Sequence, residues 1–257
     1  MEPVPQDFML NIAPLFEGWN ETLIWSCLQG YMGEAWADDA EHPASAQIII
    51  GDFCFFAGVP NMALVKNIPA PFSSELILMI PRTEPWAELI EQAYPGEFEK
   101  TLRYAIKKET DIFDRAALQS YADAVPPGFA LSMMDEALYY KAKAEPWSRD
   151  LCSQFPTWAA FEARGIGVMA LCGDTPVSGA ASYTVYDKGI EIEVDTKPEF
   201  RRNGLALACC AKLILACLER GLSPSWDAHD LRSVALAEKL GYHLDKEYVT
   251  YAVSTAT

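Results

Sequence analysis

The sequence is short of basic residues. Its 257 residues include 20 lysines and arginines against 36 aspartates and glutamates, which gives a formal net charge of −16 at pH 7. Proteins that bind nucleic acid need a basic field to neutralise phosphates, so this balance argues against a nucleic-acid partner. The acidic surplus mildly favours a cationic or amine partner, although such a charge more commonly serves solubility.

Several chemical signatures are also missing. The three histidines and seven cysteines show no metal-ligand spacing and no Cys-x-x-Cys pair, so no metal site is predicted. Neither a Gly-x-Ser-x-Gly elbow nor a Walker loop occurs. No apolar run approaches the length of a membrane span, and the first residues do not resemble a signal peptide. These absences predict a cytoplasmic protein with reduced cysteines and no membrane partner.

The sequence is rich in apolar residues arranged in strand-like and helix-like patterns. Hydrophobic residues make up 51% of the chain, which is enough at this length to bury a good core. Both patterns occur in each half, which predicts the α/β (α+β) class. The strongest interruption is Pro126-Pro127-Gly128. We therefore predict an N-terminal mixed α/β half over residues 1–127 and a second domain over residues 128–257.

The clearest local pattern covers residues 190–222. Apolar and acidic residues alternate over residues 190–195, which predicts a strand with one buried face. Pro198 ends the strand, because proline cannot donate to a ladder of hydrogen bonds. Apolar residues then recur at steps of three and four over residues 205–220, which predicts a helix, and Gly221 follows as its C-cap.

The turn between this strand and this helix is suited to an anion. The first turn of a helix has four N–H groups without intrahelical partners and the positive end of the helix dipole. Gly204 and Ala206 put almost no side chain over these groups, and Arg201 and Arg202 add positive charge. A pyrophosphate fits such a site. The alternative is a plain turn whose glycine only permits tight packing and whose arginines face solvent.

The motif Arg201-x-x-Gly204-x-Ala206 resembles the R/Q-x-x-G-x-G/A pyrophosphate motif of the GNAT acetyltransferases. The following residues 224–242, which end in Lys239-Leu240-Gly241-Tyr242, resemble the next strand and helix of that superfamily. The chain is also similar to a bacterial GNAT subfamily with an additional N-terminal half. This resemblance implies a GNAT-type mixed central sheet flanked by helices in residues 128–257. It also implies an acetyl-CoA-dependent N-acetyltransferase that works by direct transfer in a ternary complex.

The resemblance assigns acetyl-CoA to the strand, turn and helix. The backbone at the end of the strand would pair with the pantetheine arm, and the turn would bind the pyrophosphate. Asp230 and Ser233 are also candidates, although Asp230 is more simply interpreted as the N-cap of the helix that begins at Leu231. The predicted cofactor-binding residues are Val194, Asp195, Thr196, Arg201, Arg202, Asn203, Gly204, Leu205, Ala206, Asp230 and Ser233.

The predicted catalytic residues are Glu191, Glu193 and His229. An amine must lose a proton before it accepts an acetyl group, and in many GNAT members an acidic residue on this strand is the base. Glu191 is the first candidate and Glu193 the second, against the alternative of a solvated strand face. His229 could serve as acid or base, against a purely structural role. Ala237 stands where many members carry the tyrosine that acts as general acid.

The acceptor is predicted to be a small-molecule amine or a peptide, and residues 1–127 are expected to form one wall of its pocket. These residues could themselves be a diverged relative of the same fold. The missing tyrosine keeps a second interpretation open, an acyl-CoA-binding regulatory module without turnover. A third is an acyltransferase for longer acyl chains. The sequence is compatible with a homodimer.

Overall fold

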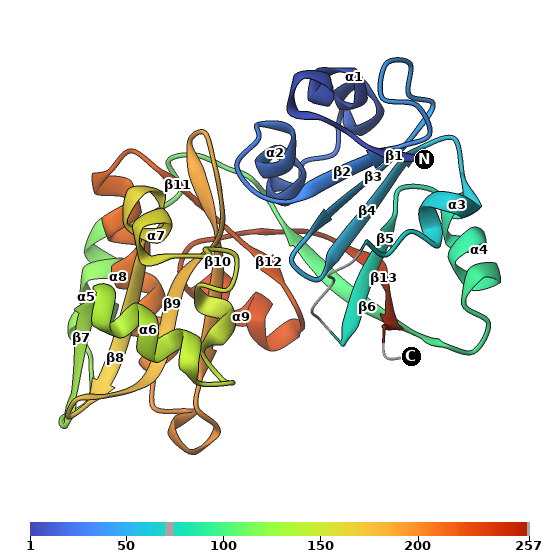
Figure 1. Ribbon diagram of the computed structural model, residues 1–257. Coiled ribbons are helices and arrows are strands. Elements are labelled where there is room, and N and C mark those ends of the chain that lie inside the picture. The colour runs from blue at the N-terminus through green and yellow to red at the C-terminus, as the bar shows by residue number, and fades with distance from the viewer. Residues whose placement is uncertain (70–74, 256–257) are drawn as a thin grey trace. The chain divides into compact units, whose positions relative to one another are not determined.

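The computed structural model describes residues 1–69 and 75–255, and the chain divides into two units (Figure 1). The first unit combines Met1–Arg103 with Glu247–Thr257, and the second is Tyr104–Lys246. The predicted boundary between residues 127 and 128 therefore lies inside the second unit. Residues before that boundary belong there because helix α5 (Arg115–Asp123) packs against helix α8 (Leu205–Glu219) of the same unit.

The first unit is built on a mixed sheet in the order β1-β2-β3-β4-β5-β13-β6, although the end of β6 (104–106) and the start of β13 (244–246) belong to the second unit. Neighbouring β4 and β5 are parallel, whereas β3 and β4 form an antiparallel hairpin. All six residues of β3 are buried, and its two polar side chains, Ser45 and Gln47, donate to the carbonyl oxygens of Val59 and Asn67. The strands are β1 (Glu2–Pro3), β2 (Glu34–Ala37), β3 (Ser45–Ile50), β4 (Phe53–Gly58), β5 (Leu76–Pro81), β6 (Phe98–Ile106) and β13 (Leu244–Ser254).

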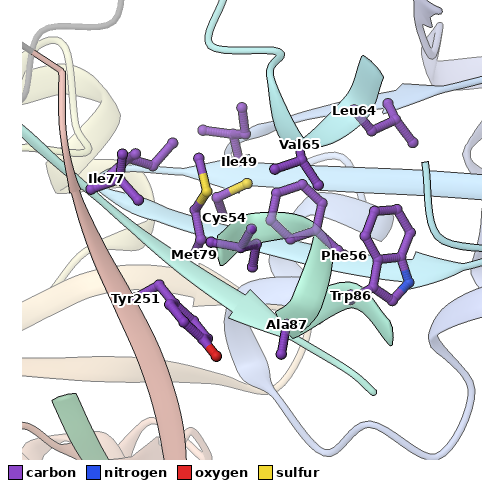
Figure 2. Close-up of a cluster of buried hydrophobic side chains, with 12 residues drawn as sticks. Ile49, Cys54, Phe56, Leu64, Val65, Ile77, Met79, Trp86, Ala87 and Tyr251 are labelled. Carbon is purple, nitrogen blue, oxygen red and sulfur yellow. The ribbon is translucent and has the colours of Figure 1, made fainter. Parts of the chain in front are cut away.

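Short helices accompany this sheet, and one of them supplies its largest core side chain. Trp86 of α4 is fully buried and stacks on Phe56 of β4, with ring centroids 5.1 Å apart. Figure 2 shows both rings among side chains that include Met79 of β5 and Tyr251 of β13. The helices are η1 (Gln6–Phe8), α1 (Met9–Ile12), η2 (Ala13–Phe16), α2 (Thr22–Leu28), α3 (Met62–Val65) and α4 (Glu84–Ala93).

The second unit holds a separate mixed sheet in the order β11-β10-β9-β8-β7. Its strands are antiparallel except for β10 and β11, which are parallel and joined through α8. The strands are β7 (Phe129–Met133), β8 (Gly167–Cys172), β9 (Thr175–Tyr186), β10 (Gly189–Thr196) and β11 (Ser223–Ser225). The helices are α5, α6 (Glu136–Ala144), η3 (Arg149–Leu151), α7 (Trp158–Arg164), η4 (Pro198–Phe200), α8 and α9 (Leu231–Lys239).

The strand, turn and helix predicted over residues 190–222 are β10, η4 and α8, of which Figure 1 labels β10 and α8. Successive residues of β9 show which faces of the sheet the helices cover. Ser178 hydrogen-bonds Cys209 of α8, whereas a Cβ at Gly179 would meet Leu151 of η3. Because side chains alternate along a strand, α8 and η3 lie on opposite faces. Asp195 pairs with Gly179, so its side chain also lies on the η3 face. Glu191 lies on the same face, because it precedes Asp195 by four residues on the same strand.

Candidate active site

Strand β10 has a strand partner on both sides only at its beginning. β9 pairs with it along its whole length, whereas β11 pairs only with Gly189, Ile190 and Glu191. The chain then leaves this sheet, and β12 (Asp227–Ala228) pairs instead with the end of β6. Within the described ranges, residues 192–196 therefore have no strand on the β11 side. This open backbone edge can hydrogen-bond an extended ligand, as an added strand would.

The N-terminus of α8 lies directly after this edge and is uncovered. Gly204 is the N-cap residue in the left-handed conformation, with φ 76° and no side-chain capping bond. A Cβ at Gly204 would meet no atom within 4 Å, so the space over the first turn is open. Arg202 is also left-handed, with φ 64°, and its side chain is exposed. An anion can approach the N–H groups of this turn without displacing a cap.

The two arginines of the turn have different surroundings. Arg201 donates through Nε to the carbonyl oxygen of Thr196 at 3.1 Å, and its guanidinium lies 3.7 Å from a carboxylate oxygen of Asp195. The Thr196 hydroxyl is itself 2.7 Å from that of Ser178 on β9. Three predicted cofactor-binding residues thus brace the turn against β10. Arg202 is the arginine better placed for an anion.

Glu191 lies where the pairing with β11 ends, and it is only 4% exposed. Its Oε2 is 3.8 Å from Nζ of Lys108, in an ion pair whose side chains are 5% and 16% exposed. Lys108 also donates to the carbonyl oxygen of Trp226 at 3.1 Å. Glu191 itself is therefore not on a solvated part of the strand face. Glu193 and Asp195, further along β10, are partly exposed.

Two hydroxyl groups flank Glu191 across the sheet. Thr184 of β9 and Ser225 of β11 are its direct partners in register, and both are buried. Directly opposed residues share a face of the sheet, so the three side chains form one polar row. Among the described residues, Thr184 Oγ1 and Ser225 Oγ have no hydrogen-bond partner. Sequence reasoning missed both residues and Lys108, because none stands in a local motif.

The phenols near this row are neutral and bind the backbone. Tyr186 donates to the carbonyl oxygen of Ser223, and burial raises the pKa of this tyrosine to about 12. Tyr242 donates to the carbonyl oxygen of Pro224, and burial raises its pKa well above the ordinary value. Ala237, at the position of the usual tyrosine, is fully buried. Both hydroxyls hold β11 in place.

The remaining predicted residues follow β12. His229 is exposed. Asp230 is the N-cap of α9 and accepts from the N–H groups of Arg232 and Ser233. Hydrogen bonds from the Arg232 side chain lower the pKa of Asp230. Ser233 accepts from the indole N–H of Trp226 at 3.0 Å. The interpretation of Asp230 as a helix cap is confirmed, whereas cofactor contacts of Asp230 and Ser233 stay predictions.

Two features are absent from the described part of the chain. No group of three or more histidine, cysteine, aspartate or glutamate side chains in residues 1–69 and 75–255 could hold a metal ion. In the same residues, no helix is both long enough and apolar enough to cross a membrane.

Comparison with known proteins gives a consistent result. The profile of the GNAT acetyltransferase family matches residues 13–251. The chain is 26% identical to the uncharacterized N-acetyltransferase YdfB of Bacillus subtilis, over 90% of this chain and 89% of that protein. It is 44% identical to a GCN5-related N-acetyltransferase-like protein from Streptococcus suis, whose crystal structure matches with a TM-score of 0.90 over 96% of this chain and 98% of that one.

The chain belongs to the GNAT acetyltransferase family, whose members generally use acetyl-CoA. The predicted family, the mixed α/β fold class and the enzyme class are thereby confirmed. A tandem GNAT protein from the clavulanic acid biosynthesis pathway also shares the fold, with a TM-score of 0.55 and 11% identity over 98% of this chain and 94% of that one.

Proposed function

We propose that this chain transfers the acetyl group of acetyl-CoA directly to an amine while both are bound. The observation that carries the proposal is the position of Glu191. This buried carboxylate lies where β10 loses its β11 partner, at the start of an open backbone edge that leads to an uncapped helix N-terminus. A proton acceptor and two binding elements therefore lie along one strand.

The residues present fit acetyl-CoA. The N–H groups from Asn203 to Ala206 and the Arg202 side chain would hold its pyrophosphate, because nothing covers the turn at Gly204. The backbone of residues 194–196 would pair with the pantetheine arm. When bound, acetyl-CoA supplies the acetyl group as an activated thioester.

Glu191 then has a specific task. An acceptor amine is mostly protonated near neutral pH, and Glu191 takes up its proton directly or through one water molecule. Glu193 is the second candidate on the same face, and it is more exposed. The acidic groups on this face and the net charge of −16 favour a cationic acceptor, either a small-molecule amine or a peptide.

Direct transfer is favoured over a covalent intermediate on a buried cysteine by the state of the buried thiols. Burial raises the pKa of Cys209 and Cys217 to about 12 and that of Cys152 to about 11. Cys210 is fully buried and shifted in the same direction. A thiol is a nucleophile only as thiolate, so these groups are inert near pH 7.

The proposal is tested with Gly204→Glu, which puts a negative charge over the first turn of α8. Gly173→Glu is the matched control, because Gly173 is also left-handed and faces open space, in the turn between β8 and β9. Calorimetry should show that acetyl-CoA binds the wild type and the control but not Gly204→Glu. Thiol release over a panel of amines should then depend on the acceptor.

The outcomes separate the rival interpretations. Binding of acetyl-CoA without thiol release for any amine would support the regulatory module instead. Faster release from longer acyl-CoA thioesters would support the acyltransferase for longer chains. If the folded wild type binds no acyl-CoA, the proposed function fails.

A further inference from the structure

Lys108 lies at the point where β10 and β11 separate. Its ammonium group contacts both sides of the opening, at 3.8 Å from Glu191 Oε2 and 3.1 Å from the carbonyl oxygen of Trp226. Trp226 directly follows Ser225, the last residue of β11 and the partner of Glu191 in register. One side chain thus bridges the strand that carries the proton acceptor and the chain that leaves the sheet.

The backbone around Lys108 is held in place within the second unit. The end of β6 pairs with β12 through Tyr104 and Ala105. The N–H of Lys107 donates to the carbonyl oxygen of His243 at 2.9 Å. Because this backbone is already ordered, the ion pair with Glu191 does not have to order it. Its contact with Glu191 is therefore a built feature of the second unit.

The groups that face Glu191 differ in charge. Tyr186 on β9 and Tyr242 after α9 are neutral, because burial raises the pKa of each phenol. Glu193 and Asp195 carry negative charge further along β10, and like charges favour protonation of a buried carboxyl. Desolvation acts in the same direction. Lys108 is a cation that opposes both effects at short range.

We propose that Lys108 is a positioning residue, which keeps the Glu191 carboxylate ionised and aimed at the opening between β10 and β11. The role rests on the proposed function, since Glu191 must be ionised to take a proton from the acceptor amine. Without the cation, a buried glutamate takes up its proton at a higher pH and is no longer a base under ordinary conditions.

The experiment follows the titration of Glu191 itself, so that it needs no turnover. Carbon-13 NMR of glutamate-labelled protein gives the midpoint, and the signal is assigned by its loss in Glu191→Gln. Lys108→Gln keeps a donor for the Trp226 carbonyl without the charge, and Lys108→Arg keeps the charge. We expect Lys108→Gln to raise the midpoint by about one pH unit or more, and Lys108→Arg to change it little.

The control is Lys141→Gln, which removes a cation that donates to the Asp174 carbonyl at the surface. It should leave the Glu191 midpoint unchanged. An unchanged midpoint in folded Lys108→Gln would overturn the proposal. If Lys108→Gln does not fold, the wild type decides, because a midpoint well above the ordinary glutamate value of about 4.3 would show that Lys108 does not keep the carboxylate ionised.

Activity adds a readout that separates this proposal from the proposed function. Where an amine is acetylated, the acid limb of the pH–rate profile should move up in Lys108→Gln with the NMR midpoint, while the Kd of acetyl-CoA stays the same. If the wild type acetylates no amine, the proposed function fails, and the titration still decides the role of Lys108.

Discussion

Thr184 of β9 lies directly opposite Glu191 of β10, and this pairing depends on a bulge. The register shifts between Glu191, which pairs with Thr184, and Ile192, which pairs with Ser182. Tyr183 is therefore the extra residue of β9. Without the bulge, Tyr183 rather than Thr184 would lie opposite Glu191. Bulges next to active sites re-aim side chains in this way. Here the bulge places a buried hydroxyl beside the proposed base.

That hydroxyl leads to a prediction on stability and activity together. Thr184 Oγ1 has no hydrogen-bond partner among the described residues, and a buried polar group left unpaired costs about 1–3 kcal/mol. We expect Thr184→Val to raise the free energy of unfolding by about 1 kcal/mol. The same change should lower kcat several-fold, because the hydroxyl faces the base. Urea unfolding and steady-state kinetics measure the two effects.

Ser182 is the control on the same strand. Its hydroxyl is buried but satisfied, since it accepts from the N–H of Ile166 at 3.1 Å and donates to the carbonyl of Ile166 at 3.2 Å. Ser182→Ala should lower the free energy of unfolding by about 1 kcal/mol, opposite in sign to Thr184→Val. Destabilisation by both substitutions would show that the Thr184 hydroxyl is satisfied in solution.

The two arginines of the turn should separate binding from stability. We expect Arg202→Gln to weaken acetyl-CoA about tenfold without changing stability, because a lost charged contact of about 1.4 kcal/mol gives that factor. Arg201→Gln should lower the stability of the fold as well, since it loses the hydrogen bond to the Thr196 carbonyl. Calorimetry and thermal melts measure both quantities. Arg220→Gln, at the other end of α8, is the control, and equal weakening there would point to net charge rather than to the turn.

The thiols allow a test of direct transfer. Cys172 is the exposed cysteine among the seven, and the others are buried. Iodoacetamide near pH 8 should therefore modify one cysteine quickly, and Cys172→Ser should abolish this fast phase. Because buried thiols with a raised pKa do not react, the modified protein should retain its acetyltransferase activity. If iodoacetamide inactivates Cys172→Ser faster than the protein unfolds, a reactive thiol lies in the site.

The segment from β10 to α8 could be predicted from the sequence, because every signal in this segment is local. Alternation over residues 190–195, the stop at Pro198 and the glycine at 204 each act within a few residues of their place in the chain. The glycine of the Arg201-x-x-Gly204-x-Ala206 motif leaves the turn open at Gly204 in the structure. The family resemblance rests on the same short stretch.

The division of the chain could not be predicted in this way. A Pro-Pro-Gly run indicates a turn, but it does not indicate which unit the residues before and after it join. Residues before it join the second unit through the packing of α5 on α8, and β13 returns to the sheet of the first unit. Thr184 reaches Glu191 through strand register and a bulge, and Lys108 reaches it from the segment that follows β6. Neither contact with Glu191 produces a periodic pattern that could be recognised in the sequence.

Asp230 gives a prediction on pH dependence. Hydrogen bonds from Arg232 lower its pKa in the folded state below the ordinary aspartate value of about 3.9. A lowered pKa contributes stability that is complete above the unfolded value and is lost as pH falls through the folded one. We expect Asp230→Ala to cost about 1 kcal/mol at pH 7, as for other N-caps. The difference from the wild type should shrink below about pH 4.

Asp230→Asn is the matched control for this helix cap. Asparagine is an N-cap as good as aspartate, so it should keep most of the stability at pH 7 and lose the pH dependence. Chemical unfolding of the three proteins between pH 3 and pH 7 measures both effects. The Kd of acetyl-CoA, measured at pH 7 on the same samples, decides the second role predicted for this residue. An unchanged Kd in Asp230→Asn would leave Asp230 as a cap alone, whereas a large change would place its carboxylate at the cofactor.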